Sequence, residues 1–289
     1  MDFVGKRKIF YTLSLILLLL SVISFFVQGL NYGIDFMGGT LLQVEFEKAG
    51  VTNEDVRTTL EEFGLEKSSL QQSEDSFIIK ALELDKEKRG EVLKSLEDNH
   101  GKFELLRNEN VGPVVGDELK RVGIIALVIA FVLQIIYISF RFEFRFGIAG
   151  IMALFHDAII TIGFFSLFQY EVDLTFVAAL LSIVGFSIND TIVIFDRIRE
   201  NLKTTRKVDL AELVNNSIKQ NLVRTFNTSF TVAVMLFALL LFGGETTYNF
   251  ALAMLVGVIC GVYTTVFLAS SLWYDFVPLV NGQKKIVKL

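Results

Sequence analysis

The sequence predicts a polytopic α-helical membrane protein with six transmembrane helices and one extracytoplasmic α+β domain. Apolar side chains make up 52% of the 289 residues, and the mean hydropathy is +0.53, which is more than a soluble domain keeps out of water. Six apolar runs are long enough to cross a bilayer, which takes roughly 20 helical residues. A long polar stretch separates the first run from the other five. With 2 Pro and no low-complexity tract, disorder is excluded.

The predicted spans cover approximately residues 9–29, 121–139, 147–168, 174–196, 224–242 and 249–273. They divide the chain into a cytoplasmic N-terminus with the first helix at 1–30, an extracytoplasmic domain at 31–118, a five-helix bundle at 119–275 and a cytoplasmic tail at 276–289. A basic start and an apolar run at 6–27 are also typical of a signal peptide. The QGLNYG that follows has no small-x-small cleavage pattern, so we expect an uncleaved anchor.

Positive charge predicts the orientation of the spans, because Lys and Arg accumulate on the cytoplasmic side of a membrane protein. They precede the first span, occur in the second-to-third and fourth-to-fifth connections, and recur in the tail: Lys6, Arg7, Lys8, Arg141, Arg145, Arg197, Arg199, Lys203, Arg206, Lys207, Lys219, Lys284, Lys285 and Lys288. The connections at 169–173 and 243–248 contain neither residue. Both termini are therefore expected in the cytoplasm. The net charge of −5 argues against a nucleic-acid partner.

The extracytoplasmic segment shows alternating strand and helix patterns. Residues 40–47 alternate as a strand, and residues 52–63 begin with a Thr/Asn cap and continue with helical spacing. The patterns that follow predict strands near 68–72 and at 76–81, a helix at 85–99 and a strand at 102–108. This βαββαβ order is that of the ferredoxin-like fold, in which two helices cover one face of an antiparallel sheet.

The extracytoplasmic domain shows no signature of an enzyme. It has twice as many acidic as basic residues, and it contains no nucleophile motif, phosphate-binding loop or cluster of metal ligands. We therefore expect either a passive cap or a binding surface, since an exposed sheet edge can accept an extended peptide. The single cysteine, Cys260, rules out an internal disulfide and a cysteine-based zinc site.

Ionisable side chains inside the predicted spans are the main functional signal, because a charge in hydrocarbon costs at least roughly 2.5–3.5 kcal/mol. His156 and Asp157 lie about 15 Å into the third span, and Asp190 lies about 10 Å inside the cytoplasmic edge of the fourth. Arg224 begins the fifth span. Since a connection of about five residues makes the third and fourth spans antiparallel neighbours, Asp157 and Asp190 are able to approach each other.

Helical spacing places further polar residues on the same helix faces as these ionisable side chains. Ser187, Asp190 and Thr191 share one face of the fourth span, next to a small polar stripe made by Ser182, Gly185 and Asn189. The fifth span repeats the pattern with Arg224, Asn227, Thr228 and Thr231. Burial favours a neutral carboxylic acid and a nearby arginine favours the carboxylate, so an acid here can exchange protons. Two structural alternatives stay open: Arg224 extends to the headgroups, or Asp157 and His156 form a structural pair.

Several motifs closely resemble the SecF family of bacterial protein-export membrane subunits. The segment 154–201 contains HD at 156–157, EVDL at 171–174 and GFSINDTIVIFDRIREN at 185–201. GIDFMGGT at 33–40 and RTFNTS at 224–229 match the same family, so the resemblance covers nearly the whole chain. Phe186 is a mild departure, because many members carry Tyr there.

The resemblance implies a member of the resistance-nodulation-division superfamily in the bacterial cytoplasmic (inner) membrane. Such a subunit pairs with SecD, associates with the SecYEG channel and uses the proton-motive force in late export of unfolded polypeptides. In that family the Asp of INDT and the Arg of the RT-NTS pattern are linked to proton passage, which selects Asp190 and Arg224 here. The candidate proton-transfer residues are Asp190, Arg224, Asp157, Asn189, Ser187, Thr191 and Asn227, and the further motif residues are Asp35, Gly38, Gly39, His156, Asp196 and Arg197. No cofactor or metal is implied.

Other functions remain as alternatives at this point. One is a proton-coupled exporter of small molecules or lipids from the same superfamily, and another is a passive scaffold that stabilises SecD. A membrane hydrolase with Asp157 and Asp190 as a dyad lacks a Gly-x-Gly-Asp context. Because neighbours on a helix point to different faces, a joint metal site at His156 and Asp157 is not expected. Protons and Na⁺ are both open as the coupling ion.

Overall fold

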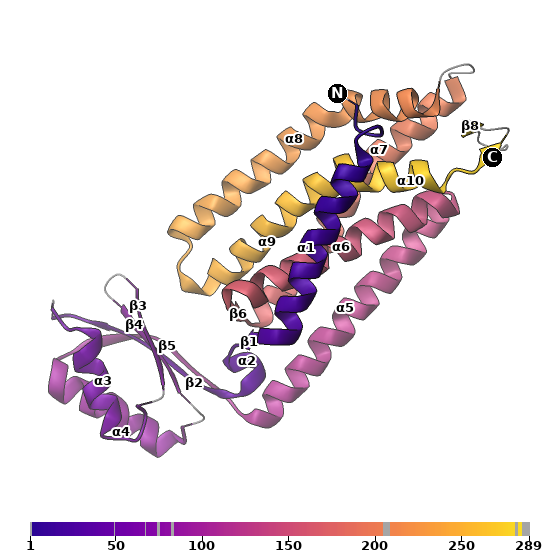
Figure 1. The fold of residues 1–289 in the computed structure, drawn as a ribbon. Helices are drawn as coiled ribbons and strands as arrows, with labels where there is room; N and C mark the ends of the chain where they lie inside the picture. Colours follow the sequence, from indigo (N-terminus) through magenta and orange to yellow (C-terminus); the bar gives the residue numbers. More distant parts are fainter. Residues whose placement is uncertain are drawn as a thin grey trace. The chain divides into compact units, whose positions relative to one another are not determined.

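The structure is a computed structural model that describes residues 2–48, 50–66, 68–73, 76–81, 84–204, 209–280 and 283–284. The chain divides into two compact units, one formed by Met1–Asn31 with Ile125–Leu289 and the other by Tyr32–Ile124 (Figure 1). Within the described ranges, six helices are long and apolar enough to cross a membrane, which confirms the predicted polytopic architecture. Four lysines and arginines of the orientation argument, Arg206, Lys207, Lys285 and Lys288, lie outside the described residues.

The membrane helices follow the apolar runs but extend beyond them. They are α1 (Arg7–Gln28), α5 (Pro113–Arg141), α6 (Phe144–Phe168), α7 (Leu174–Thr204), α8 (Leu210–Phe242) and α9 (Glu245–Tyr263), which continues through a π-helical segment η1 (Thr264–Ala269) into α10 (Ser270–Phe276). Much of the predicted 4–5 connection is therefore helical, since α7 and α8 both continue past the apolar run. Charged residues form helix as readily as apolar ones once they are outside the hydrocarbon, so hydropathy marks the bilayer and not the helix end.

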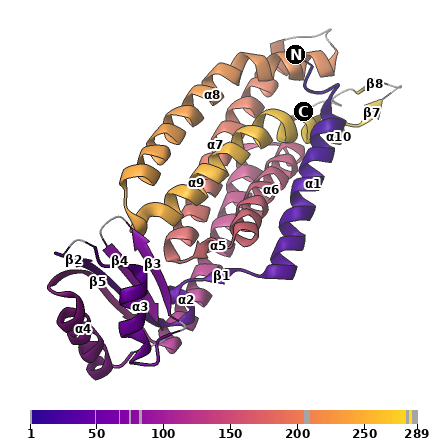
Figure 2. The ribbon, with the colours of Figure 1, turned by 60° about the vertical axis from the view of Figure 1, so that its left-hand side comes forward.

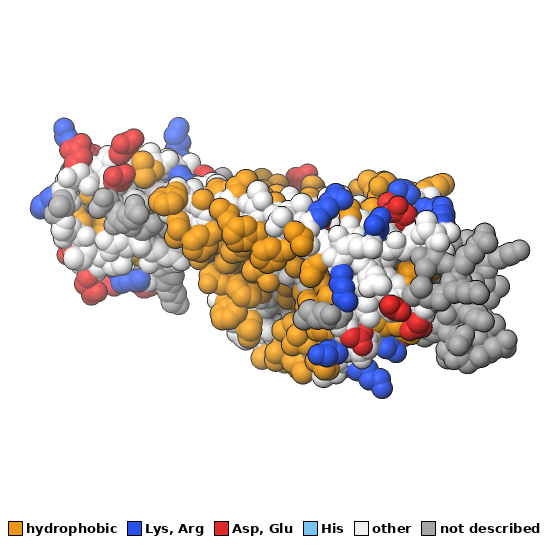
Figure 3. All heavy atoms as spheres, turned by 90° about the horizontal axis from the view of Figure 1, so that it is seen from above, with side chains coloured by type: hydrophobic (Ala, Val, Ile, Leu, Met, Phe, Trp, Pro, Cys, Tyr) orange, Lys and Arg blue, Asp and Glu red, His pale blue; other side chains and the backbone are white. Residues whose placement is uncertain are grey.

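Burial separates the six helices into an inner and an outer set. More than half of the apolar window is buried in α6 and in the helix formed by α9, η1 and α10, and half is buried in α7, whereas less than a fifth is buried in α1, α5 and α8. Figure 2 shows α7, α8 and α9 running alongside one another. Hydrophobic side chains cover much of the visible face of the helical unit, and charged side chains gather toward one end (Figure 3). A bilayer would cover the exposed apolar faces.

Two glycines allow α9 to pack closely against α7. A Cβ atom on Gly257 would lie 2.3 Å from Cδ1 of Ile183, and one on Gly261 would lie 3.3 Å from Oγ of Ser187. Small residues let helix backbones approach in this way inside membranes. The close approach brings the start of η1 next to the middle of α7, where the polar side chains lie.

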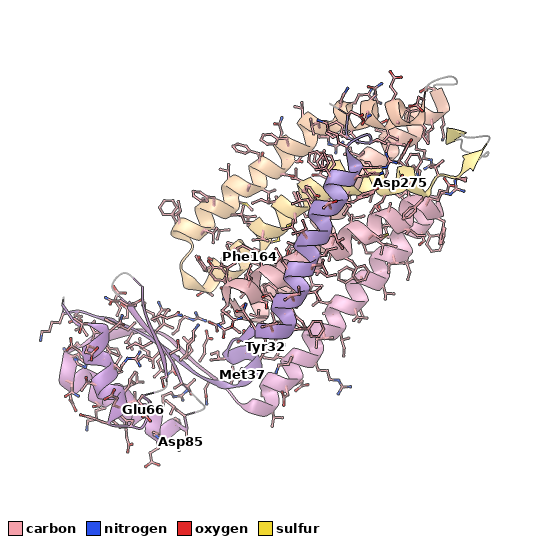
Figure 4. The ribbon with its side chains drawn as sticks, viewed as in Figure 1. Tyr32, Met37, Glu66, Asp85, Phe164 and Asp275 are labelled. Carbon is pink, nitrogen blue, oxygen red and sulfur yellow. The ribbon has the colours of Figure 1, made fainter. Side chains whose placement is uncertain are left out.

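The N-terminal residues are anchored in the helical unit. Phe3 and Val4 are buried, and Oδ1 of Asn215 in α8 accepts hydrogen bonds from both backbone N–H groups, at 2.8 and 3.0 Å. Arg7 of α1 makes a 3.0 Å ion pair with Asp275 at the end of α10 (Figure 4). The first and last membrane helices are thereby joined at this end of the bundle.

The second unit has the predicted ferredoxin-like topology. Its elements are α2 (Ile34–Met37), β2 (Gly39–Phe46), α3 (Asn53–Glu61), β3 (Ser69–Ser73), β4 (Ser76–Ala81), α4 (Lys86–His100) and β5 (Phe103–Val111). The strand order is β3-β4-β2-β5, and each neighbouring pair is antiparallel. Leu42 and Val44 of β2 pack with Val56 of α3 and with Val92 of α4, so both helices cover the same face. The short strands are β1 (Asn31–Tyr32), β6 (Glu171–Val172), β7 (Leu279–Val280) and β8 (Gln283–Lys284).

Candidate functional site

The centre of the helical unit contains a fully enclosed carboxylate, Asp157 of α6, which is 0% exposed. Its Oδ2 atom accepts a 2.5 Å hydrogen bond from the hydroxyl of Ser187 in α7 and a 3.0 Å hydrogen bond from the hydroxyl of Thr264, the first residue of η1. Thr264 reaches Asp157 at the point where the helix changes to π geometry, a feature that is frequent at functional sites. Three helical elements therefore meet at this one side chain.

His156, 3% exposed, is the neighbour of Asp157 in both sequence and space. Its Nδ1 lies 3.4 Å from Oδ1 of Asp157, and its ring stacks on Tyr263 with the centroids 6.0 Å apart. Helical spacing places the two adjacent side chains on different faces, yet they are in contact here, as in the structural pair that the sequence left open. Nε2 of His156 has no hydrogen-bond partner among the residues that the structure describes.

A chain of hydroxyl groups continues from this cluster along α7. Thr191, one turn beyond Ser187, is 2.8 Å from the hydroxyl of Thr265 in η1, and both side chains are buried. The predicted face of Ser187, Asp190 and Thr191 therefore lies in the interior, as helical spacing requires.

Asp190 belongs to the same helix but is directed toward α8. It is 7% exposed, and its Oδ2 atom accepts a 3.4 Å hydrogen bond from Ser229. Its carboxyl group also interacts electrostatically with Arg224 and with the hydroxyl of Thr228. Among the described residues no hydrogen bond or ion pair joins Asp190 to Asp157. The short connection between α6 and α7 therefore does not bring the two acids into direct contact. Ser187 of α7, which bonds to Asp157, lies three residues before Asp190 on the same helix.

Arg224 lies on the surface of α8, where it lines a pocket of about 320 Å³ between α7 and α8. The other lining residues are Val193, Asp196, Arg197, Glu200, Gln220 and Asn221. Asp196 makes a 2.8 Å ion pair with Arg141 of α5, and Arg197 donates to Gln220 at 2.5 Å and to Glu200 at 2.6 Å. Asp196 and Arg197 therefore connect α7 to its neighbours, beside the guanidinium of Arg224.

The predicted polar face of α8 is largely exposed, although Arg224 and Thr228 on it interact with Asp190. Asn227, Thr228 and Thr231 are exposed together with Arg224, and so are Ser182, Gly185 and Asn189 on α7. Asn189 lies about 100° around α7 from the buried residues on either side of it, and Asn227 lies two residues from the buried Thr225 and Ser229, so neither joins the buried cluster. They form part of an exposed polar surface on α7 and α8.

Four residues of the site were not selected from the sequence. Ser229 lies within the RTFNTS motif, four residues after Thr225, and both side chains are buried. This i, i+4 spacing of small polar residues could have identified the face of α8 that contacts Asp190. Tyr263, Thr264 and Thr265 gave no such signal. The π-helical segment that turns them toward α6 and α7 has no recognisable sequence pattern.

The GIDFMGGT motif lies in the second unit. Asp35 is in the first turn of α2, and Gly38 and Gly39 follow it with φ of 75° and 150°. A Cβ atom on Gly39 would be 2.6 Å from the carbonyl oxygen of Ala81, and one on Gly116 of α5 would be 3.1 Å from the backbone nitrogen of Gly38. In Figure 4 the labels of Tyr32 and Met37 show where the segment that contains α2 begins and ends. The two glycines of the motif therefore shape the backbone of the second unit.

The described residues contain no group of three or more His, Cys, Asp or Glu side chains arranged to hold a metal ion. The chemistry available in the bundle is that of two buried carboxyl groups, one imidazole and their hydroxyl donors. Such groups can bind, hold and release protons.

Comparisons with known proteins place this arrangement among protein-export components. Residues 91–278 match the C-terminal part of the protein export membrane proteins SecD and SecF, and residues 23–49 match the SecD/SecF GG motif. The chain is 40% identical over 275 residues to the protein translocase subunit SecF of Sebaldella termitidis, covering 93% of this chain and 89% of that protein. It is 41% identical over 294 residues to the SecF of Endomicrobium trichonymphae, covering 99% and 94%.

A solved structure gives a similar result. The crystal structure of SecDF from Thermus thermophilus, described as a translocon-associated membrane protein, superposes with a TM-score of 0.85 and 40% identity over 94% of this chain. SecDF in its super-membrane-facing form superposes with a TM-score of 0.70 and 39% identity. This chain spans 38% of the SecDF polypeptide.

Proposed function

This chain belongs to the SecD/SecF family of protein export membrane proteins, and from that premise we propose that it is a SecF-type accessory subunit of the Sec protein translocase. In this role it works with SecD and uses the proton-motive force to assist late steps of export. The observation that carries the proposal is the carboxyl group of Asp190, held 7% exposed inside a membrane helix between Ser229 and the surface arginine Arg224.

Asp190 has the surroundings that a proton carrier needs. An acid within the hydrocarbon region is costly as an anion, so it favours the protonated form unless a cation lies close by. Arg224, one helix away and exposed at the pocket, supplies that cation. Movement of α8 relative to α7 would change the separation of the two groups and so bind or release a proton.

The exposed polar surface on α7 and α8 supports association with a second membrane subunit. Ser182, Gly185 and Asn189 on α7 and Arg224 and Asn227 on α8 are exposed at the level of apolar spans, where lipid tails offer no hydrogen bonds. SecD is the partner we propose for this surface, because SecDF is one polypeptide of which this chain matches 38%. Asn189 and Asn227 would then take part in proton transfer at the interface, while Ser187, Thr191 and Asp157 would act from the interior.

The distribution of charge supports the orientation. Lys and Arg precede α1 and occupy the connection between α7 and α8, whereas 169–173 and 243–248 contain neither. Both termini would thus be in the bacterial cytoplasm and the Tyr32–Ile124 unit on the outer side. There the acidic ferredoxin-like domain would contact an exported, unfolded polypeptide that emerges from the SecYEG channel.

The proton-motive force supplies enough energy to change the position of the extracytoplasmic domain. Moving one charge through 100 mV supplies about 2.3 kcal/mol, which shifts a two-state equilibrium by roughly fiftyfold. A domain with two positions of similar free energy would change position with each proton.

The test is Asp190→Asn, with Asp117→Asn as the matched control because it removes the same charge from a side chain that is 84% exposed. We expect Asp190→Asn to abolish the part of export that collapses when an ionophore dissipates the proton gradient, while the variant still co-purifies with SecD. Replacing Na⁺ in the medium distinguishes the two coupling ions. Normal gradient-dependent export by Asp190→Asn would refute the carrier role and favour a passive scaffold.

A further inference from the structure

The two buried acids differ in the group that can neutralise their charge: Asp190 interacts with Arg224, whereas Asp157 interacts with His156. Among the described residues, the only ion-pair partner of Asp157 is His156, at 3.4 Å. Both side chains are almost completely buried, at 3% and 0% exposure. A buried carboxylate without a cation is strongly destabilised, so this pair gains stability when it takes up a proton that turns the imidazole into the counter-ion of Asp157.

The hydrogen bonds determine where that proton can be. Oδ2 of Asp157 is already bonded to the hydroxyls of Ser187 and Thr264. Oδ1 faces Nδ1 of His156, which can donate an N–H to it. This is the arrangement in which a carboxylate orients an imidazole and leaves its Nε2 atom as the basic nitrogen. Nε2 is buried and has no partner, so its lone pair is available.

In the part of the chain that the structure describes, the imidazole has polar neighbours, and no lysine or arginine is paired with it or with Asp157. From α9, Tyr263 stacks on the ring, and Cys260 lies close enough to Asp157 to interact with it electrostatically. The hydroxyl of Tyr263 is 3.0 Å from that of Ser14 and donates to the carbonyl of Phe10 at 2.7 Å, both in α1. From α7 the neighbour is Ser187, since Asp190 faces α8. Arg7 of α1 is paired with Asp275 of α10.

We propose that His156 and Asp157 form a proton-holding dyad inside the bundle, in which Asp157 orients the ring through Nδ1–H and Nε2 takes up and releases one proton. Hydronium delivers the proton: an N–H bond forms at Nε2, an O–H bond of hydronium breaks, and water leaves. The resulting imidazolium pairs with the Asp157 carboxylate. The dyad is a second proton site, separate from Asp190, and the inference rests on the proposed proton-coupled function.

The first experiment observes the imidazole directly. The chain has 2 histidines, so His100→Gln in the full-length protein leaves His156 as the only one, and ¹⁵N NMR in bilayers reports its two nitrogens. We expect Nδ1 to carry the proton and Nε2 to be bare at the high end of the range from about pH 5 to 8, and Nε2 to become protonated as the pH falls. Asp157→Asn should remove the preference for Nδ1–H. An Nε2–H tautomer, or a spectrum unchanged across this range, would overturn the dyad.

The second experiment separates a basic nitrogen from a structural hydrogen bond. In His156→Asn the amide nitrogen replaces Nδ1 and can still donate to Asp157, but no basic atom remains. We expect gradient-dependent export to fall at least about tenfold in this variant. Thr161→Val is the matched control, because the hydroxyl of Thr161 donates at 2.8 Å to the backbone carbonyl of Asp157, so this variant loses a buried hydrogen bond next to the dyad without losing a basic atom. Export by His156→Asn at the level of this control would overturn the proposal.

Different experimental results would refute the dyad and the proposed function. Asp190→Asn should leave the ¹⁵N signals of His156 unchanged, because Asp190 makes no contact with the ring in the described structure. Normal export by Asp190→Asn together with a titrating Nε2 refutes the carrier role and keeps the dyad. Loss of export by Asp190→Asn together with an Nε2 that never accepts a proton refutes the dyad and keeps the carrier.

Discussion

The hydroxyl of Ser187 donates a 2.5 Å hydrogen bond to Oδ2 of Asp157, joining α7 to α6 where both side chains are buried. Ser187 lies three residues, or almost one helical turn, before Asp190. The interior acid and the acid directed at α8 are therefore connected through a single helix.

Ser187→Ala should destabilise the helical unit by about 1–3 kcal/mol, because it removes a hydrogen bond to a buried carboxyl group. Thermal unfolding of the full chain in detergent measures the loss. Ser182→Ala is the control, since Ser182 is exposed on the same helix and its hydroxyl bonds to the carbonyl of Ala178. Equal stabilities of the two variants would show that the bond to Asp157 contributes nothing.

Gly257→Ala should disrupt the contact between α9 and α7, because the added methyl would lie 2.3 Å from Cδ1 of Ile183. Overpacking of this kind costs about 1–3 kcal/mol. The double variant Gly257→Ala with Ile183→Ala should be less destabilised than the sum of the two single changes. Gly185→Ala, with nothing within 4 Å of its added Cβ, is the neutral control. Strict additivity in the thermal midpoints would contradict this account of the packing.

Two glycines of the second unit should respond in opposite directions. Gly39→Ala places a methyl 2.6 Å from the carbonyl oxygen of Ala81 at a φ of +150°, so β2 must shift. Gly90→Ala fills open space within α4 and should stabilise that helix by roughly 0.5–1 kcal/mol. Hydrogen exchange of the β2 and α4 amides in the full chain distinguishes the effects. Faster β2 exchange is expected for Gly39→Ala, and unchanged β2 protection would refute the steric argument.

Asp55 makes the start of α3 sensitive to acid. Hydrogen bonds from the side chain and backbone N–H of Thr52 lower the pKa of Asp55 below its ordinary value of 3.8. A lowered pKa in the folded state stabilises the cap at pH values above 3.8 and loses that effect as the pH falls through the folded-state pKa. The protection factors of the first α3 amides, taken relative to their intrinsic exchange rates at each pH, should therefore fall in acid. Asp55→Asn should remove this dependence, and a variant with the wild-type pH profile would contradict the assignment.

The secondary structure of the second unit could be predicted closely because its local signals agree. The Thr52–Asp55 capping box begins α3, and His100 ends α4 before Gly101, as their residue types indicate. In contrast, the lengths of α7 and α8 were underestimated, because apolar runs report contact with lipid and not the end of a helix. The contact between Asp157 and His156 was one of the alternatives left open, because helical spacing does not say how neighbouring side chains bend in a packed core.

The amino-acid sequence alone determined the six spans, the βαββαβ order and the acids that lie inside the membrane, since each depends on local composition or spacing. Only the tertiary structure decided which polar groups meet: Asp157 with Thr264 and Asp190 with Ser229, while Asn189 and Asn227 are directed outward. The rotation of each helix and the π-helical turn depend on how all the helices pack together. No short stretch of sequence contains that information.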